Sequence, residues 1–196
     1  MKNFILSVLT VLIATVFIAA MPTEKEAAIY EDTLRLHILA NSDSKEDQEL
    51  KLKIRDGILE RFGKKLGELN SSEDAELVLL PLLPEIEACA EKIANDEGFS
   101  YSVSARLSEE WFDTREYEDF TLPKGIYSSL IIEVGAAEGK NWWCVMFPPL
   151  CLDIASEKAP ADDALINYSK EEISLISHSK YNIKFKILEL LSGSIK

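Results

Sequence analysis

Apolar and polar positions follow different rhythms along the chain, and each rhythm predicts a different element. Between residues 33 and 39 every second side chain is apolar, which predicts a half-buried strand that exposes Arg35 and His37. From 45 to 66 the apolar side chains recur at four-residue steps, so a long amphipathic helix is expected. Gly57 weakens that helix by about 1 kcal/mol relative to alanine and marks a close contact with another helix.

Proline and alternation define the remaining elements. Pro81 and Pro84 interrupt the helical pattern of 73–95, so two short helices are expected there. Alternating or apolar runs predict strands over 99–107 and 127–134, and the aromatic and acidic stretch 111–120 is an edge strand or a structured loop. A loop of hairpin length follows over 135–139, a short helix is expected over 170–178, and an apolar stripe over 183–191 predicts a C-terminal helix.

The stretch 141–147 is an unbroken run of aromatic, apolar and sulfur side chains, which favours a strand that Pro148 and Pro149 end. On a strand Trp142 and Trp143 point to opposite faces, so neither face is polar. Two interpretations follow. The strand is central and packed on both sides, or one face meets the core and the other a partner protein.

These elements predict an α+β fold, in which an antiparallel sheet of about four strands packs against helices. Lys2 and the apolar stretch 4–20 precede the first charged segment, a pattern typical of an export signal that is either cleaved near Met21 or kept as an anchor. We therefore expect a signal or anchor over 1–21, a linker over 22–32 and a single α+β domain over 33–196. The domain would lie outside the cytoplasm.

Charge narrows the choice of partners. The 196 residues carry a formal net charge of -13, which would repel phosphate backbones and anionic lipid surfaces. Nucleic acid is therefore not an expected partner, and contact with a membrane is expected only through the N-terminal segment.

The three cysteines, Cys89, Cys144 and Cys151, leave the disulfide state open. One bond between Cys144 and Cys151 across the proline turn is the simplest pairing in an exported chain. Three buried thiols that act as small apolar side chains are an equal alternative.

No spacing in the sequence builds a zinc or calcium site, and no phosphate-binding or dinucleotide-binding motif is present, so no metal or cofactor is expected. One enzymatic alternative survives. Cys144 as nucleophile, His37 as base and Asn41 or Asp43 as orienting group would suit a thiol-dependent hydrolase of the cell envelope. A membrane-anchored structural factor is a further alternative.

Two blocks resemble the stage II sporulation protein R family. The first is Leu34-Arg-Leu-His-Ile-Leu-Ala-Asn-Ser-Asp43, followed by Asp47-Gln48 and the helix Lys51-Leu-Lys-Ile-Arg-Asp56. The second joins Phe120-Thr-Leu-Pro123, Gly125 and Tyr127 to Gly139-Lys-Asn-Trp-Trp-Cys-Val-Met-Phe-Pro-Pro-Leu-Cys151. Ile54 stands where the family more often has valine, and Gly57 where alanine would be expected.

The resemblance implies a secreted signal of endospore formation and no enzyme. It would be made in the forespore, exported into the space between the forespore and mother-cell membranes, and would activate a membrane-embedded aspartic protease of the mother cell that processes a sigma factor precursor. We hypothesise that the partner contacts the following residues: His37, Asn41, Asp43, Trp142, Trp143 and Phe147.

Overall fold

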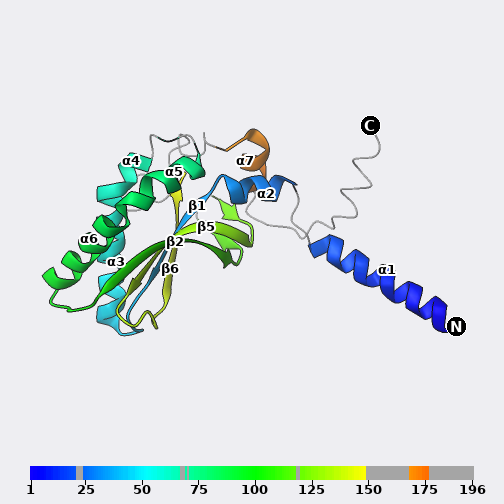
Figure 1. Cartoon of the computed structure of the whole chain (residues 1–196), viewed down its shortest axis with the longest axis horizontal. Coiled ribbons are helices and arrows are strands. Elements are labelled where there is room, and N and C mark those ends of the chain that lie inside the picture. The colour runs from blue at the N-terminus through cyan, green and yellow to red at the C-terminus, as the bar shows by residue number, and fades with distance from the viewer. Residues whose placement is uncertain (21–23, 67–68, 70, 118–119, 149–167, 177–196) are drawn as a thin grey trace.

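A mixed four-stranded sheet forms the centre of the computed structural model, which describes residues 1–20, 24–66, 69, 71–117, 120–148 and 168–176 (Figure 1). In sheet order its strands are β2 (Val103–Phe112), β5 (Gly125–Val134), β1 (Leu34–Leu39) and β6 (Asn141–Phe147). β2 is antiparallel to β5, and β1 is antiparallel to β6. β1 and β5, however, are parallel, so the α+β class is confirmed and the all-antiparallel pairing is wrong.

The parallel pair arises because β1 lies between two strands that are joined by a short loop. Residues 135–140 connect β5 to β6 without pairing them, since β1 occupies the place between them. The loop of hairpin length therefore joins two strands that do not pair with each other. The long connection that a parallel pair requires is supplied by the helices and by β2, which come between β1 and β5 in the sequence.

Helices and short segments complete the described structure. The helices are α1 (Lys2–Ala20), α2 (Glu24–Glu31), α3 (Lys45–Ile58), α4 (Lys64–Leu66), α5 (Ser72–Leu79), α6 (Leu83–Asp96) and α7 (Lys170–Ile176). A π-helical turn, Leu59–Gly63, joins α3 to α4, and a 3-10 turn, Leu80–Leu82, joins α5 to α6. β3 (Arg115–Glu116) and β4 (Thr121–Leu122) form a separate two-stranded sheet.

The helices predicted over 45–66 and 73–95 agree with the structure. The Ser44 side chain accepts a hydrogen bond from the Asp47 backbone and caps α3, as expected for a serine that precedes an acidic first turn. The helix continues to Leu66 through the π-helical turn. Pro81 lies in the break between α5 and α6. A Cβ at Gly57 would collide with the Ile93 side chain of α6, which confirms that this glycine allows two helices to approach closely.

Both faces of β1 are buried, which corrects the expectation that Arg35 and His37 are exposed. Leu36 and Ile38 face the helices and have no exposed surface. On the other face Arg35 is 0% exposed and His37 is 5% exposed. The polar residues are covered because β1 lies inside the sheet, where Trp143 of the neighbouring β6 and Phe112 of β2 close over them.

Two strands differ from their predictions in length or place. β2 begins at Val103 and continues to Phe112, so it includes residues assigned to a separate edge strand or loop. β6 has the predicted bounds, but it lies at one end of the sheet among the described strands instead of in its centre. Neither Gly nor Pro interrupts 99–112, which is the signal that one long strand runs through this stretch.

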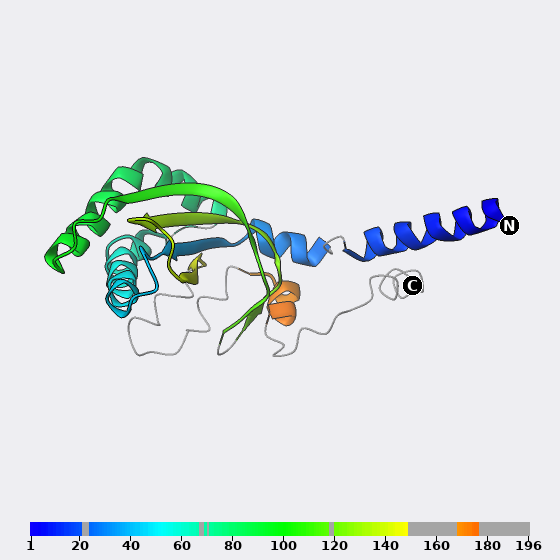
Figure 2. The ribbon, with the colours of Figure 1, turned by 90° about the horizontal axis from the view of Figure 1, so that it is seen from below.

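Two segments far apart in the sequence, α2 and α7, lie together beside the sheet. α2 packs beside α7 and β5, with Ile29 fully buried and the Tyr30 ring edge-on to Tyr127. α1 projects from the body with exposed apolar side chains (Figure 2). Within the described part of the chain, no helix combines the length and apolarity needed to cross a bilayer. The segment 149–167 and the helix expected over 183–191 fall outside the described residues.

Candidate partner-binding site

The turn after β1 forms a network that we call the polar clamp, made of Asn41, Ser42, Asp43 and Asp47 around the loop 135–140. Asp47 Oδ2 accepts hydrogen bonds from Asn41 Nδ2 at 2.9 Å and from the Ser42 hydroxyl at 2.5 Å. Asp47 is 4% exposed. The carboxylate therefore fixes the turn from inside the first turn of α3.

The polar clamp also holds the loop between β5 and β6. Asn41 Oδ1 accepts the backbone N–H of Ala136 at 2.9 Å, and Asp43 Oδ1 accepts that of Lys140 at 2.6 Å. Gly139 donates its N–H to the Ala40 carbonyl, and a Cβ at Gly139 would collide with the Ser42 carbonyl. Both predicted contact residues, Asn41 and Asp43, thus have structural partners inside the chain.

Burial and hydrogen bonding shift the pKa values of Asp47 in the polar clamp and of the neighbouring Lys51. Burial acts to raise the pKa of Asp47, but hydrogen bonds from Ser42 and Asn41 outweigh it and hold that pKa below its ordinary value. Lys51 donates to the Lys140 carbonyl at 2.9 Å, and burial lowers its pKa. An ionised Asp47 is therefore part of the folded structure at neutral pH.

A second cluster covers the opposite face of β1. The His37 imidazole stacks on Trp143 with ring centroids 3.7 Å apart, and its Nδ1 lies 2.7 Å from Glu110 Oε2. Burial lowers the pKa of His37, although the Glu110 carboxylate acts in the opposite direction. Since the neutral ring is favoured, His37 serves as a packed aromatic side chain whose Nδ1–H donates to the Glu110 carboxylate.

Arg35 lies in the same layer beneath aromatic rings. Its guanidinium carbon is 3.9 Å from the centroid of Phe112 and 5.1 Å from that of Tyr127, and its NH2 nitrogen donates to the Tyr117 hydroxyl at 2.9 Å. Burial lowers the pKa of Arg35. Within the described residues, cation–π contacts stand where a buried arginine usually has an ion pair.

The remaining predicted residues face the helices. The Arg55 guanidinium of α3 lies 4.5 Å from the Trp142 ring centroid, and Phe147 is 1% exposed. Thus His37 and Trp143 meet on one face, Asn41 and Asp43 meet in the polar clamp, and Trp142 and Phe147 pack on the other face. Whether any of them contacts a partner stays a prediction.

The thiol and imidazole of the hydrolase alternative are separated by the sheet. Trp143 stacks on His37, and Cys144, the next residue, points to the opposite face. Cys144 is also held in a disulfide, whereas Cys89 is a free thiol. Cys151, the predicted partner of Cys144, lies outside the described residues. The described chain brings no three potential metal ligands together.

Sequence reasoning missed the residues of β2 that complete the His37 layer. The sequence pattern places Phe112 in a different element from residues 99–107 and assigns Glu110 to neither, so it does not predict that both lie close to β1. β2 pairs regularly with β5, from Val103 with Val134 to Phe112 with Gly125. This pairing places Glu110 and Phe112 beside β5, the strand that separates β2 from β1.

Comparison with known proteins gives one relationship. The family model described as stage II sporulation protein R matches residues 30–157. The chain is 37% identical to stage II sporulation protein R of Bacillus subtilis strain 168 over 155 residues, which is 78% of this chain and 69% of the relative. No solved structure matches the chain. The protein therefore belongs to the stage II sporulation protein R family, and its role is in sporulation.

Proposed function

We propose that this protein is an extracytoplasmic signal of endospore formation. It is exported from the forespore into the space between the two membranes, and it activates a membrane-embedded aspartic protease that processes a mother-cell sigma factor precursor. The observation that carries the proposal is the family relationship, because it spans both sequence blocks and almost all of the sheet.

The N-terminal segment supports export. α1 carries Lys2 at its start, and its side chains from Asn3 to Ile18 are apolar or uncharged. A positive start followed by such a run suits recognition as a signal, whether it is then cleaved or kept as an anchor.

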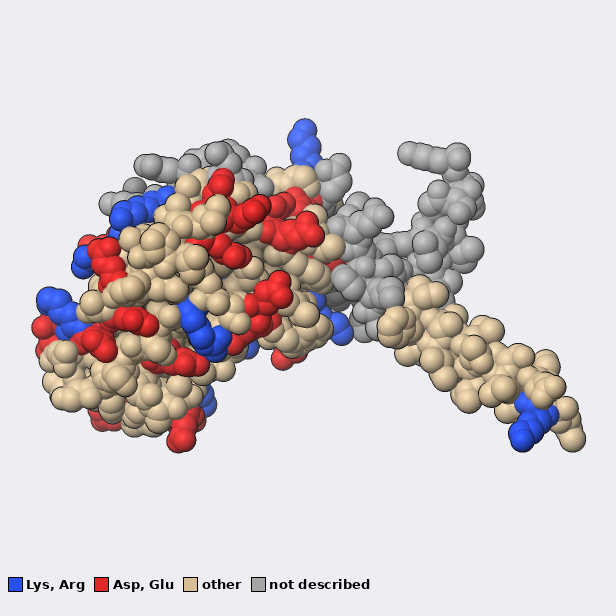
Figure 3. Space-filling model, viewed as in Figure 1, with Lys and Arg blue, Asp and Glu red and all other residues tan. Residues whose placement is uncertain are grey.

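The acidic surface supports a protein partner over a phosphate-rich one. Acidic side chains gather over much of the face shown in Figure 3, in keeping with the net charge of -13. A surface of this sign disfavours nucleic acid and anionic lipid headgroups. Recognition by another protein, with complementary charge, fits it better.

The separation of Cys144 from His37 supports a binding role over thiol hydrolysis. General-base activation of a thiol requires the base within about 3 Å of the sulfur or one water away. Residues on opposite faces of one sheet do not meet that condition. Activation of the protease is therefore proposed to occur by contact.

The test uses Bacillus subtilis lacking its own stage II sporulation protein R. The full chain is expressed in the forespore, and cleavage of the sigma factor precursor is followed by immunoblot. We expect cleavage to be restored, and a variant without residues 2–20 to leave the precursor intact because it remains in the cytoplasm. Restoration by that shortened variant would contradict signalling across the membrane, and loss of cleavage with the full chain, present and folded, would contradict the proposed function.

A further inference from the structure

Among the described strands β2 lies at an edge of the sheet, and α6 blocks the first half of that edge. Glu91 Oε1 accepts the Val103 N–H at 3.2 Å, and Glu87 Oε1 accepts the Ala105 N–H at 2.8 Å. Two carboxylates one helical turn apart therefore occupy two donors that would otherwise point to the open edge. This is how proteins commonly prevent another strand from adding to a sheet.

No described residue protects the second half of the same edge in this way. Backbone N–H groups point alternately to the two sides of an antiparallel strand. The N–H groups of Leu107, Glu109 and Trp111 therefore point to the open edge, as those of Val103 and Ala105 do. None of the described residues accepts a hydrogen bond from the N–H groups of these three. The Glu109 carbonyl accepts one long bond of 3.4 Å from the Ser108 hydroxyl.

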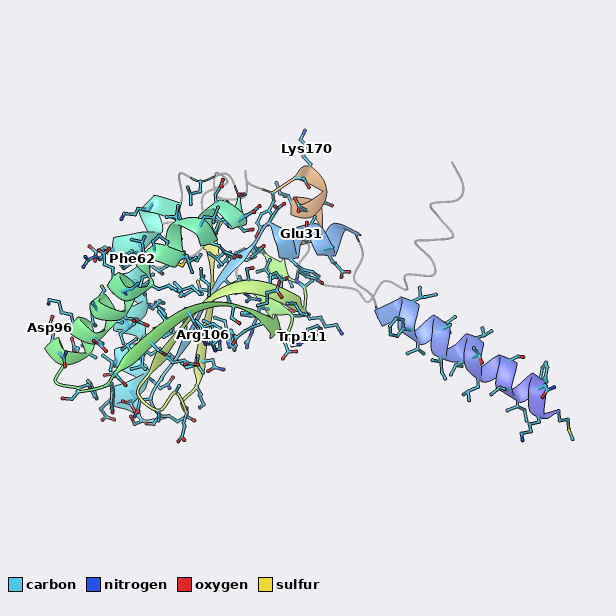
Figure 4. All side chains as sticks on the ribbon, viewed as in Figure 1. Glu31, Phe62, Asp96, Arg106, Trp111 and Lys170 are labelled. Carbon is cyan, nitrogen blue, oxygen red and sulfur yellow. The ribbon has the colours of Figure 1, made fainter. Side chains whose placement is uncertain are left out.

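An apolar pair marks the end of this open stretch. Trp111 pairs with Ile126 of β5, and the two residues are 60% and 55% exposed. Figure 4 shows Trp111 at the end of β2 that lies away from Asp96, the last residue of α6. Side chains of this size seldom lie exposed next to each other on a sheet without a partner.

A cleft lined in part by acidic side chains lies beside the open stretch. About 200 Å³ of space lies between Glu76 of α5 and the strands, lined also by Leu107, Ser108, Glu109, Ser128 and Ser129. In the described part of the chain neither Glu76 nor Glu109 forms an ion pair. Two unpaired carboxylates therefore border the place where the side chains of an added strand would lie.

We propose that residues 107–111 bind an extended segment of the partner protein as an added strand of the sheet. The added strand places an apolar side chain against Trp111 and, two residues along, a Lys or Arg between Glu109 and Glu76, since alternate side chains lie on one face. The inference rests on the proposed function, because the partner is the protease. A second copy of this chain does not fit, since pairing two such edges would bring Glu109 and its neighbours together with like charges.

The test replaces the outward N–H of Glu109 and leaves the β2–β5 ladder intact. Proline is tolerated at an edge position whose N–H faces away from the sheet, so Glu109→Pro removes one donor and obstructs the added strand. Glu109→Gln is the matched control that removes the charge and keeps the N–H. Glu49→Gln, an exposed change on α3, reports on charge alone.

The full chain or each variant is co-expressed with the protease and the sigma factor precursor, and co-purification of the protease and precursor cleavage are both measured. Glu109→Pro should reduce the complex on the order of tenfold, Glu109→Gln by less, and Glu49→Gln not at all. Trp111→Ser, which changes an exposed side chain, should also weaken the complex and keeps the test valid if the proline variant fails to fold.

The outcomes separate the two proposals. If the unaltered chain neither binds the protease nor causes cleavage, the proposed function is wrong and this inference falls with it. If the unaltered chain is active and both Glu109→Pro and Trp111→Ser match it, the function stands and the strand-addition surface is wrong. Loss of self-association in Glu109→Pro, measured by sedimentation, would assign the edge to a second copy and also overturn the proposal.

Discussion

The polar clamp and the open half of β2 are both rich in polar side chains, but they differ in where their hydrogen bonds go. In the polar clamp, Asn41, Asp43 and Asp47 each bond to groups of the same chain. Along residues 107–111 of β2 the outward donors meet no described acceptor. Satisfied polar groups indicate a structural role, whereas an unsatisfied row of backbone groups is available to another chain.

The same difference applies to residues 34–43, the first of the two blocks that resemble the family. Residues 34–43 suggested a contact surface because their polar side chains follow a strand. In the folded chain those side chains close the sheet around β1 and hold the loop that carries the chain into β6. We expect substitutions there to reduce stability, and substitutions at the β2 edge to reduce binding.

The largest loss of stability is expected from Asp47→Ala. The change removes the acceptor of Asn41 and Ser42 inside a buried site and should lower the free energy of unfolding by about 3 kcal/mol. Urea denaturation followed by circular dichroism measures it. Glu49→Ala, on the exposed side of the same helix, should cost less than about 0.5 kcal/mol. Equal losses would show that the polar clamp does not stabilise the fold.

A somewhat smaller loss is expected from Gly139→Ala. The added Cβ would collide with the Ser42 carbonyl and the Ala40 side chain, and the free energy of unfolding should fall by about 2 kcal/mol. Gly57→Ala is the matched control, because its Cβ meets only the movable end of Ile93 and helix propensity improves. A thermal melt of both variants compares them, and a larger loss at Gly57 would contradict close packing of the loop against the polar clamp.

A smaller, pH-dependent effect is expected from His37. Its pKa in the folded chain lies below the ordinary 6.5 because of burial, so the unfolded chain binds the proton more tightly. The contribution to stability is therefore complete above pH 6.5 and declines as the pH falls from there through the folded pKa.

His37→Gln removes this titration while an amide can still bond to Glu110. Urea denaturation at several pH values between 7.5 and 5 should give a shallower dependence for the variant than for the unaltered chain. Identical slopes would show that His37 titrates as it does in an unfolded chain, with Glu110 compensating fully for burial.

The smallest effect on stability is expected at the open edge. Trp111→Thr changes a side chain that is 60% exposed, so the free energy of unfolding should move by less than about 0.5 kcal/mol. Threonine also retains a high preference for strands. Loss of more than about 2 kcal/mol in a urea melt would place Trp111 in the core and remove the contrast between the two regions.

Most individual elements could be predicted from the sequence because each depends on local periodicity. The four-residue steps from Leu50 to Leu66 and the prolines at 81 and 84 define the helices, and the run 141–147 defines β6. Strand pairing could not be predicted. The insertion of β1 between β5 and β6 depends on contacts between residues far apart in the sequence. A local pattern carries no information about such contacts.

The candidate site was predictable in its residues more than in their roles. The block containing His37, Asn41 and Asp43 can be recognised in the sequence, but burial of His37 against Trp143 depends on the register between β1 and β6. The open edge at Leu107–Trp111 was not foreseen, because a sequence shows which residues form a strand and not which strand lies at the edge.

The position of β1 has a consequence for the order of folding. Leu34 pairs with Ser128, and Leu39 with Asn141, so the first strand of the sheet finds its neighbours only after α3 to α6 and β2 have been synthesised. Contacts of such sequence separation slow the search for the native state. β1 therefore cannot be enclosed on both sides by its neighbouring strands until β6 has been synthesised.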